Sequence, residues 1–251
     1  MRGLRGRRVV ITGAAGDIGA AIARTLLDAG AVVTGTDIKT PESAAPVLDS
    51  LRAAAAPDTF DYEVLDITSR AAVDAFFAAA EPPDVVIANA GIVESAPFLE
   101  VTSEQWQHHL DTNLTGTFNV TQAAARAMIA GHKPGHVIVM GSWVESVAWP
   151  EIAAYSASKA GIHMLARTAA LELAEHQVRV NVIAPGIVDA GLAAHQLATE
   201  PQYAARVKSA IPLGALQTVE QVADVTAFLC SDHANYMTGS VLLADGGCSL
   251  A

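Results

Sequence analysis

The stretch that decides the fold reads Val9-Val10-Ile11-Thr12-Gly13-Ala14-Ala15-Gly16-Asp17-Ile18-Gly19. Its β-branched start predicts a buried strand, and its end opens an Ala/Leu-rich segment of helical period. Glycines between a strand and a helix permit a tight turn and let a pyrophosphate approach the backbone at the helix N-terminus. The stretch therefore predicts a dinucleotide site with Gly13, Asp17 and Ile18 at the cofactor. A turn whose glycines serve only close packing is the alternative.

The rest of the chain alternates short β-branched runs with helical segments, and no linker or low-complexity segment divides it. This alternation predicts a single α/β domain over residues 1–251, a Rossmann fold with a doubly wound seven-stranded parallel sheet and helices on both faces. The expected strands are 8–12, 31–37, 59–65, 85–89, 136–142, 179–184 and 241–244. The expected helices are 17–29, 69–80, 103–130, 153–175 and 219–230, with a mobile helical insertion at about 189–212 beside the ligand crevice.

Composition limits the classes of partner. The chain has 251 residues, 51% of them hydrophobic, and a formal net charge of −11, with a mean hydropathy of +0.33. The acidic balance argues against nucleic acid or an anionic membrane as the partner, because both need a basic surface. The basic N-terminus precedes only a three-residue apolar run, so we do not expect a leader, and no apolar run reaches the roughly 18 residues of a membrane helix.

Cysteine and histidine usage points to a cytoplasmic protein without a metal. Cys230 and Cys248 are the only cysteines, too few for a disulfide framework or a thiolate metal site. The eight histidines show no spacing tied to carboxylates or cysteines, so we expect no metal site.

Asp37 ends the second expected strand, eighteen residues after Gly19. A carboxylate at this position accepts hydrogen bonds from an adenosine ribose and repels a 2′-phosphate, which predicts NAD as the cofactor. An aspartate that only caps a turn is the alternative, and Lys39 nearby leaves room for NADP.

Three side chains form the expected catalytic centre. Tyr155 and Lys159 lie four positions apart in a predicted helix and share one face, and Ser142 lies thirteen positions before Tyr155. A positive charge within about 4 to 6 Å favours a phenolate, so Lys159 is expected to bring the Tyr155 pKa down from about 10. For the pair alone, packing and solubility are the plainer interpretation.

Together these residues resemble the short-chain dehydrogenase/reductase family over residues 9–247. The family's motifs occur in order: the turn 12–19, Asp66, Asn89-Ala90-Gly91, Asn113, Ser142, Tyr155 with Lys159, Pro185-Gly186 and Asp245-Gly246-Gly247. The resemblance implies NAD-linked interconversion of a secondary alcohol and a carbonyl. It implies that Tyr155 exchanges the proton, Ser142 hydrogen-bonds the reacting oxygen and Lys159 also binds the nicotinamide ribose.

The same resemblance implies further contacts. Asp66 and Ile67 hold the adenine, Asn89, Ala90 and Gly91 border the cofactor, Asn113 supports a water path to Lys159, and Pro185, Gly186 and Val188 lie along the nicotinamide. Asp66 could instead cap a helix, and Asn113 could stabilise a helix kink. The resemblance also implies a homotetramer, with the helices of Asn113 and Tyr155 and the C-terminal segment near its interfaces.

Two positions depart from the family pattern. Asp17 replaces the usual central glycine of the turn, where its carboxylate can cap backbone N–H groups yet lies near phosphate. Ala190 stands where the family commonly has a threonine that contacts the nicotinamide carboxamide. Ala190→Thr is therefore expected to tighten NAD binding.

The stretch between Ser142 and Pro150 is expected to recognise the substrate, and it resembles the glucose 1-dehydrogenase branch of the family. Glu145 could accept hydrogen bonds from a polyol, and Trp149 could pack against a sugar ring. Glu94 and His195 are further candidates. Glu145 facing water and Trp149 only shaping the turn is an equally open interpretation.

The favoured function is thus an NAD-dependent oxidoreductase of an aldose or polyol. The alternatives are a dehydrogenase or reductase of a less polar secondary alcohol or a 3-oxoacyl substrate, with NAD or NADP, and a non-catalytic dinucleotide sensor. A sensor would be expected to lack Ser142, Tyr155 or Lys159, and all three are present.

Overall fold

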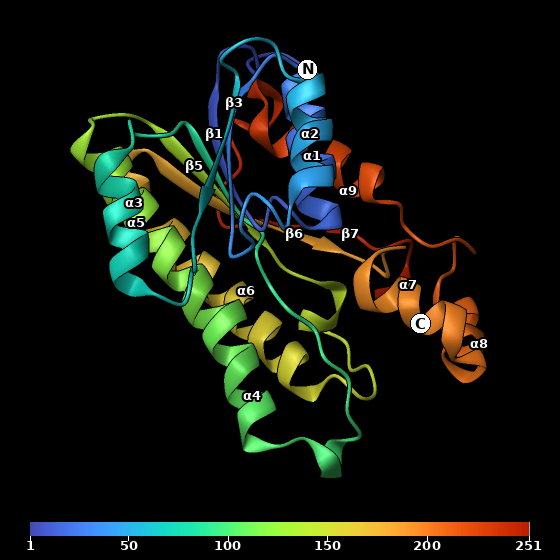
Figure 1. The fold of residues 1–251 in the computed structure, drawn as a ribbon. Helices are drawn as coiled ribbons and strands as arrows, with labels where there is room; N and C mark the ends of the chain where they lie inside the picture. The colour runs from blue at the N-terminus through green and yellow to red at the C-terminus, as the bar shows by residue number, and fades with distance from the viewer. Residues whose placement is uncertain (251) are drawn as a thin grey trace.

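The computed structural model describes residues 1–250, apart from the side chain of Lys208. Its centre is a seven-stranded sheet in the order β3-β2-β1-β4-β5-β6-β7 (Figure 1). Every neighbouring pair is parallel. The strands are β1 Arg8–Thr12, β2 Val32–Asp37, β3 Phe60–Val64, β4 Val85–Ala88, β5 Gly135–Met140, β6 Val178–Pro185 and β7 Val241–Ala244. The predicted doubly wound parallel sheet is confirmed.

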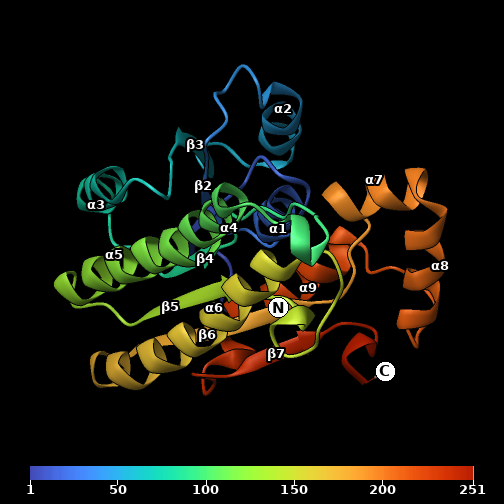
Figure 2. The same cartoon turned by 90° about the horizontal axis from the view of Figure 1, so that it is seen from below.

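Helices cover both faces of this sheet (Figure 2). One layer contains α1 Asp17–Asp28, α2 Ala45–Ala54 and α9 Val219–Cys230, and the other contains α3 Arg70–Ala79, α5 Thr117–Ala130 and α6 Ala153–Leu173. The remaining α-helices are α4 Ser103–His109, α7 Gly191–Thr199 and α8 Pro201–Ala210.

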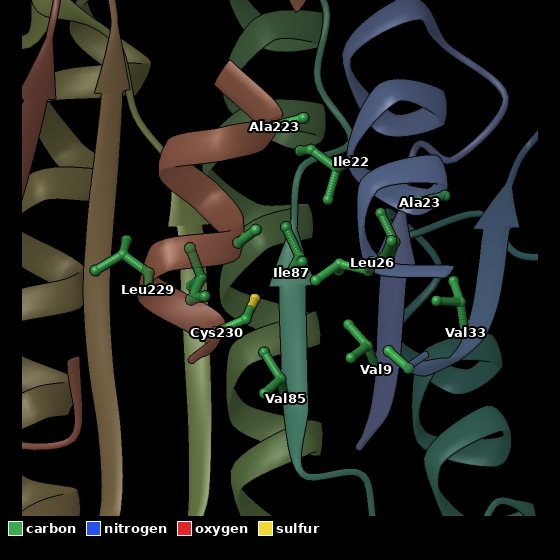
Figure 3. Close-up of a cluster of buried hydrophobic side chains, with 14 of the residues drawn as sticks. Val9, Ile22, Ala23, Leu26, Val33, Val85, Ile87, Ala223, Leu229 and Cys230 are labelled. Carbon is green, nitrogen blue, oxygen red and sulfur yellow. The ribbon is translucent and has the colours of Figure 1, made fainter. Parts of the chain in front are cut away.

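The side chains along each strand point alternately to the two faces of the sheet, and each face has its own apolar core. Val9 and Ile11 of β1 pack with α1 and α9, while Val10 between them packs with the layer of α3, α5 and α6. Figure 3 shows the first core, in which Ile22 of α1 and Ala223 of α9 lie beside each other. Successive side chains of a strand point to opposite faces, so continuous apolar strands are what a sheet covered on both sides requires.

The strands begin or end within two residues of the expected positions. Asn89 and Ser142, expected at strand ends, lie one and two residues beyond β4 and β5. Both residues are therefore in the loops at the carboxyl edge, which is where ligands of such sheets bind.

The helical expectations were incomplete in two places. Helix α2 was not foreseen, because Pro46 suggests a turn and only Leu48 and Leu51 provide a buried apolar stripe. Proline is tolerated in the first turn of a helix, where its missing N–H is not needed. The single helix expected over 103–130 is interrupted by a π-helical segment, Leu110–Gly116, which contains Asn113.

The expected insertion after β6 consists of α7 and α8, with the break at Pro201. In both views these helices project beside the carboxyl edge of the sheet (Figures 1 and 2). Their mobility stays a prediction. Among residues 1–250, no helix has the length and apolar character needed to cross a bilayer.

Candidate active site at the carboxyl edge of the sheet

The glycine turn is locked to the loop after β4. Gly13 has φ +70°, and a Cβ there would lie 2.8 Å from the Cα of Ala90. Thr12 Oγ1 accepts hydrogen bonds from the backbone N–H groups of Asn89 and Ala90, both at 3.1 Å. The Asn89 amide donates back to the Thr12 carbonyl at 3.0 Å. Glycine is required here by both conformation and space, and the two loops form one rigid edge.

The N-terminus of α1 suits a pyrophosphate. Its N-cap, Gly16, makes no side-chain hydrogen bond, so the first-turn N–H groups are not capped by a side chain. A Cβ on Gly19 would lie 2.8 Å from the Gly13 carbonyl carbon, so the helix approaches the turn as closely as the dinucleotide motif demands. Ile18 packs against the core beneath.

The Asp17 side chain contacts the insertion after β6. Its Oδ2 accepts a hydrogen bond from the Gly191 backbone N–H at 3.1 Å, at the beginning of α7. The carboxylate therefore ties the glycine turn to the insertion, a contact that the sequence did not indicate.

Asp37 holds the turn from the end of β2. Its two carboxylate oxygens accept hydrogen bonds from Ala15 N at 3.1 Å and Lys39 N at 3.2 Å. Burial and the Asp37 charge raise the pKa of Tyr62 to about 12, so Tyr62 keeps its proton and donates to the Lys39 carbonyl at 2.6 Å. The Lys39 ammonium donates to the Ala15 carbonyl at 3.1 Å. A fixed negative charge thus lies beside the turn, with one lysine next to it.

Asp66 and Ile67 border the same edge after β3. Asp66 Oδ1 accepts hydrogen bonds from the backbone N–H and the hydroxyl of Thr68, at 2.8 and 2.7 Å, which is a local cap. The Ile67 carbonyl accepts from the Asn119 amide at 3.0 Å, and a Cβ on Gly116 would lie 2.7 Å from Ile67 Cδ1. Asp66 thus orders the turn before α3, whose N-cap is Ser69, and its contact with an adenine stays a prediction.

Asn113 joins three elements. It is fully buried in the π-helical segment, and its side chain bonds both the N–H and the carbonyl of Ile92, at 2.8 and 2.9 Å. Its amide also donates to Ser158 Oγ at 3.1 Å, and that hydroxyl donates to the Tyr155 carbonyl at 2.6 Å. A Cβ on Gly91 would lie 3.8 Å from Lys159 Nζ. Asn113 therefore connects the loop after β4 to the helix that carries Tyr155 and Lys159.

Ser142, Tyr155 and Lys159 come together as expected from their spacing. Lys159 Nζ lies 5.5 Å from the centre of the Tyr155 ring and donates to the Met140 carbonyl at 2.7 Å. The side chains of Ser142 and Lys159 are buried, and Tyr155 is partly buried.

The electrostatics differ from the expectation. Burial raises the pKa of Tyr155, and the Ser142 hydroxyl opposes this rise. Burial also lowers the pKa of Lys159 to about 8, and the Glu145 charge acts in the opposite direction. Desolvation, which the sequence could not reveal, is the largest cause of both shifts, and the expected lowering of the Tyr155 pKa is absent.

The segment after β6 closes the edge. Pro185 is the last residue of β6, and a Cβ on Gly186 would lie 2.7 Å from the Cα of Asp245. Gly186 N donates to Ala244 O and to Gln217 Oε1, both at 3.1 Å. Val188 pairs with Gln217 in an isolated bridge. This segment leads directly to Ala190 and α7.

Two of the four substrate candidates lie in places that the sequence did not suggest. The Glu145 side chain is 4% exposed, and its Oε1 is 3.2 Å from His163 Nδ1. Trp149 packs edge-on against Trp143 with ring centres 5.2 Å apart, and the Arg206 guanidinium lies 5.4 Å from its ring centre. Glu145 therefore points inward, and one face of Trp149 is covered by a cation.

The other two candidates lie at the surface. The Glu94 carboxylate is 3.5 Å from His108 Nδ1, and both side chains are largely exposed. The His195 side chain on α7 is exposed, whereas its neighbour Gln196 is buried and donates to Ser95 Oγ at 3.4 Å.

Sequence reasoning did not identify His163 or Arg206. His163 lies four residues after Lys159, a spacing that continues the face of Tyr155 and Lys159 and that could have drawn attention to it. Arg206 bonds Glu151 at 3.1 Å, and no sequence pattern marks that pair, because α8 and residue 151 are brought together only by the fold.

An apolar cluster adjoins Tyr155 between the loop after Ser142 and the two helices of the insertion. Its members are Trp143, Val144, Val147, Trp149, Ile152, Ile187, Ala193, Leu197, Tyr203, Val207, Ala210, Ile211, Leu216 and Cys248. A hydroxyl, a phenol and an ammonium thus meet between this apolar wall and the glycine turn. Such a set can hold an oxygen and exchange a proton with it. Within residues 1–250, no group of three or more His, Cys, Asp and Glu side chains is placed to hold a metal.

Several known proteins are similar to this chain in sequence or in structure. A family model described as enoyl-(acyl carrier protein) reductase matches residues 13–249. The 3beta-hydroxysteroid dehydrogenase 1 of Eggerthella lenta is 36% identical over 98% of this chain and 95% of its own. A short-chain type dehydrogenase/reductase from Mycobacterium marinum is 30% identical, with a TM-score of 0.88 over 99% of this chain and 97% of its own.

A further solved structure is similar along the whole chain. It is a putative NAD(P) dependent gluconate 5-dehydrogenase from Beutenbergia cavernae with bound NADP at low occupancy. It is 32% identical, with a TM-score of 0.91 over 99% of this chain and 98% of its own. The match of family model, sequence and fold over nearly the full length shows that this chain belongs to the short-chain dehydrogenase/reductase family of oxidoreductases.

Proposed function

We propose that the chain is an NAD-dependent oxidoreductase that interconverts a secondary alcohol and a carbonyl. The observation that carries the proposal is the meeting of Ser142, Tyr155 and Lys159 beside the glycine turn. The bound nicotinamide would accept or return the hydride, and the protein supplies geometry and charge.

Each residue has a role that follows from its chemistry. The Tyr155 phenol takes the hydroxyl proton in oxidation and returns it in reduction, while Ser142 holds the reacting oxygen by a hydrogen bond. Lys159, fixed by the Met140 carbonyl, favours the phenolate by its positive charge and binds the nicotinamide ribose. Asn113 fixes the loop after β4 to the helix that carries Tyr155 and Lys159 and would support a water path to Lys159.

Burial raises the pKa of Tyr155, and a positive charge close to the phenol opposes that rise. Lys159 is one such charge, and oxidised nicotinamide beside it would be a second. Tyr155 is therefore expected to lose its proton only when the cofactor is bound beside it.

The cofactor proposal rests on Asp37. Its carboxylate is fixed at the end of β2 by two backbone N–H groups, where a ribose 2′-phosphate would meet a negative charge. Lys39 lies beside it, and the similar gluconate 5-dehydrogenase was solved with NADP, so the test compares both cofactors.

For the substrate we propose a less polar secondary alcohol first. The wall beside Tyr155 is apolar, Glu145 points inward, and the relative from Eggerthella lenta is named for a hydroxysteroid. An aldose, polyol or sugar acid is the second candidate, which the likeness to a gluconate 5-dehydrogenase favours.

The test is a screen for NADH and NADPH formation with hydroxysteroids, aliphatic alcohols, aldoses, polyols and sugar acids. Tyr155→Phe is expected to lower kcat by about 10²- to 10⁴-fold, because it removes the proton-transfer group. Tyr236→Phe is the matched control, since Tyr236 is fully exposed. Equal activity of Tyr155→Phe and the wild type refutes the assignment, and NAD binding without turnover on the whole panel favours a non-catalytic sensor.

We also propose a cytoplasmic homotetramer. Apolar side chains are exposed on α5 and α6, at Phe118, Met164 and Leu171, and again at Leu243 of β7 and Leu250. The patch on α5 and α6 and the patch at Leu243 and Leu250 could each form one contact between copies of the chain, and a tetramer uses two such contacts. Light scattering after gel filtration is expected to give the mass of four 25.9 kDa chains, and a monomeric mass contradicts the proposal.

A further inference from the structure

Glu145 is a buried carboxylate next to the proposed catalytic centre. It lies in the single 3₁₀ turn Trp143–Glu145, three residues after Ser142, and its side chain is 4% exposed. Oε1 is 3.2 Å from His163 Nδ1. Oε2 is buried and has no hydrogen-bond partner among the described residues. A carboxylate in this position is costly unless a nearby charge compensates it.

The backbone leaves room for this carboxylate. A Cβ on Gly141 would lie 2.7 Å from Glu145 Oε2 and 2.6 Å from Val182 Cγ1. Glycine at position 141 therefore allows the carboxylate to lie against the backbone directly before Ser142.

The compensating charge comes from α6. Tyr155, Lys159 and His163 succeed one another at four-residue spacing and share one face of that helix. Lys159 Nζ donates to the Met140 carbonyl at 2.7 Å, and Gly141, which follows Met140, borders Glu145 Oε2. The ammonium and the carboxylate thus lie at two consecutive residues of the same backbone segment, Met140 and Gly141.

The groups that face Glu145 are few. Tyr155, Lys159 and His163 are the titratable side chains on the neighbouring face of α6, and Cys248 lies on the C-terminal turn packed against residues 143–145. From β6, Val182 and Ile183 border the same position of Gly141 as the carboxylate does, and neither carries a charge. Lys159 is the cation whose charge acts on Glu145, and Glu145 is the anion whose charge acts on Lys159.

The titration of both groups is consistent with this pairing. Burial raises the pKa of Glu145 to about 7, with the Ser142 backbone and the Lys159 charge acting against the rise. Burial lowers the pKa of Lys159 to about 8, and the Glu145 charge is what opposes it.

We propose that Glu145 is a positioning residue, whose carboxylate, oriented by His163, keeps the Lys159 ammonium protonated and directed at the Met140–Ser142 backbone. This rests on the proposed function, in which Lys159 serves Tyr155. It also gives Glu145 a different role from a substrate contact. The carboxylate interacts with the Lys159 ammonium and not with the hydroxyl groups of a sugar.

The experiment is a direct titration of the lysine. The sequence has Lys39, Lys133, Lys159 and Lys208, so ¹³Cε-labelled lysine gives a simple NMR spectrum in which Lys159→Arg assigns the signal. In Glu145→Gln, which keeps the size of the side chain and removes its charge, the Lys159 pKa is expected to fall by about one unit or more. His163→Gln keeps the carboxylate, so the Lys159 pKa must stay higher than in Glu145→Gln.

A matched control is available at the end of the same helical region. Glu175 lies 3.8 Å from His176 with its side chain 79% exposed, and Glu175→Gln must leave the Lys159 pKa unchanged. Glu145→Asp, which retains the charge, is expected to keep the Lys159 pKa close to the wild-type value. If Glu145→Gln does not fold, Glu145→Met removes the charge in its place and is expected to lower the Lys159 pKa. A Lys159 pKa that moves by less than about 0.3 unit in Glu145→Gln, or rises, overturns the proposal.

This readout is separate from turnover. If Tyr155→Phe keeps full activity while the Lys159 pKa shifts as expected, the proposed catalysis fails and the electrostatic role of Glu145 stands. If Tyr155→Phe is inactive and the Lys159 pKa does not respond to Glu145→Gln, the role of Glu145 fails alone. With a substrate from the screen, the loss of kcat at alkaline pH should begin about one unit lower in Glu145→Gln.

Discussion

The two halves of the carboxyl edge differ in the groups that form them, which are backbone groups in one half and side chains in the other. On the side of β1, β2 and β4, the backbone makes the site: a glycine at φ +70°, main-chain N–H groups and the aspartate that orders them. On the side of β5 and β6, side chains from α6, α8 and the loop after Ser142 make it. Local sequence dictates the first kind of site, whereas the second depends on which distant side chains meet. The variants below test that difference.

The largest effect on stability is expected at Gly13. Gly13→Ala places a methyl group 2.8 Å from Ala90 Cα at a left-handed φ, which should cost roughly 2 to 5 kcal/mol of unfolding free energy. Gly214, near the other half, has φ +76° and no atom within 4 Å of the place that a methyl group would take, so Gly214→Ala should cost only roughly 1 to 2 kcal/mol. Urea unfolding measures both. Equal losses would mean that crowding against the loop after β4 contributes nothing.

The next effect concerns the charge on the backbone-built side. Asp37→Asn is expected to shift the ratio of NADP to NAD affinity by about 10- to 100-fold toward NADP, because the repelling charge is removed. Fluorescence titration with NADH and NADPH measures it. Asp61→Asn removes the same charge from an exposed position of β3 and should leave the ratio within about twofold. A ratio unchanged by Asp37→Asn assigns cofactor choice to other residues.

A smaller effect is expected on the side-chain-built half. Arg206 contacts the rings of Trp149 and Tyr203 and bonds Glu151, contacts that together hold α8 by about 1 to 2 kcal/mol. Arg206→Gln should therefore speed hydrogen exchange of α8 amides about tenfold while β1 and β4 stay protected. Arg167→Gln, at an exposed position of α6, is the control. Unchanged exchange in α8 would show that Arg206 does not anchor it.

The smallest effect is expected from Ala190→Thr. Ala190 is the N-cap of α7 and makes no side-chain capping bond, so a threonine hydroxyl should stabilise the helix start by up to about 1 kcal/mol. NAD affinity should rise a few-fold, as measured by calorimetry. Ala190→Val has the same branched shape without the hydroxyl and should bring no gain. A weaker affinity in Ala190→Thr contradicts the expectation.

Much of the backbone-built half could be predicted from the sequence because the relevant rules are short-range. A β-branched run, a glycine turn and an acidic strand end indicate β1, α1 and Asp37 with almost the observed bounds. The spacing of Tyr155 and Lys159 likewise implied a shared face.

The rest required the folded chain. The sequence places Glu145 three residues from Ser142 but does not say that a 3₁₀ turn directs its carboxylate inward to His163. The raised pKa of Tyr155 depends on burial, which is a property of the assembled site. Helix α2 was missed because Pro46 suggests a turn while serving as a first-turn residue.

The hydrogen bond from Gly191 to Asp17 makes two distant parts of the chain dependent on each other. Asp17 is the first residue of α1 and Gly191 is the first residue of α7, so one carboxylate links the starts of two helices. Ala190, the other position singled out in the sequence, directly precedes the N–H that Asp17 accepts. Substitutions at positions 17 and 190 are therefore expected to give effects that do not add, because both change the start of α7.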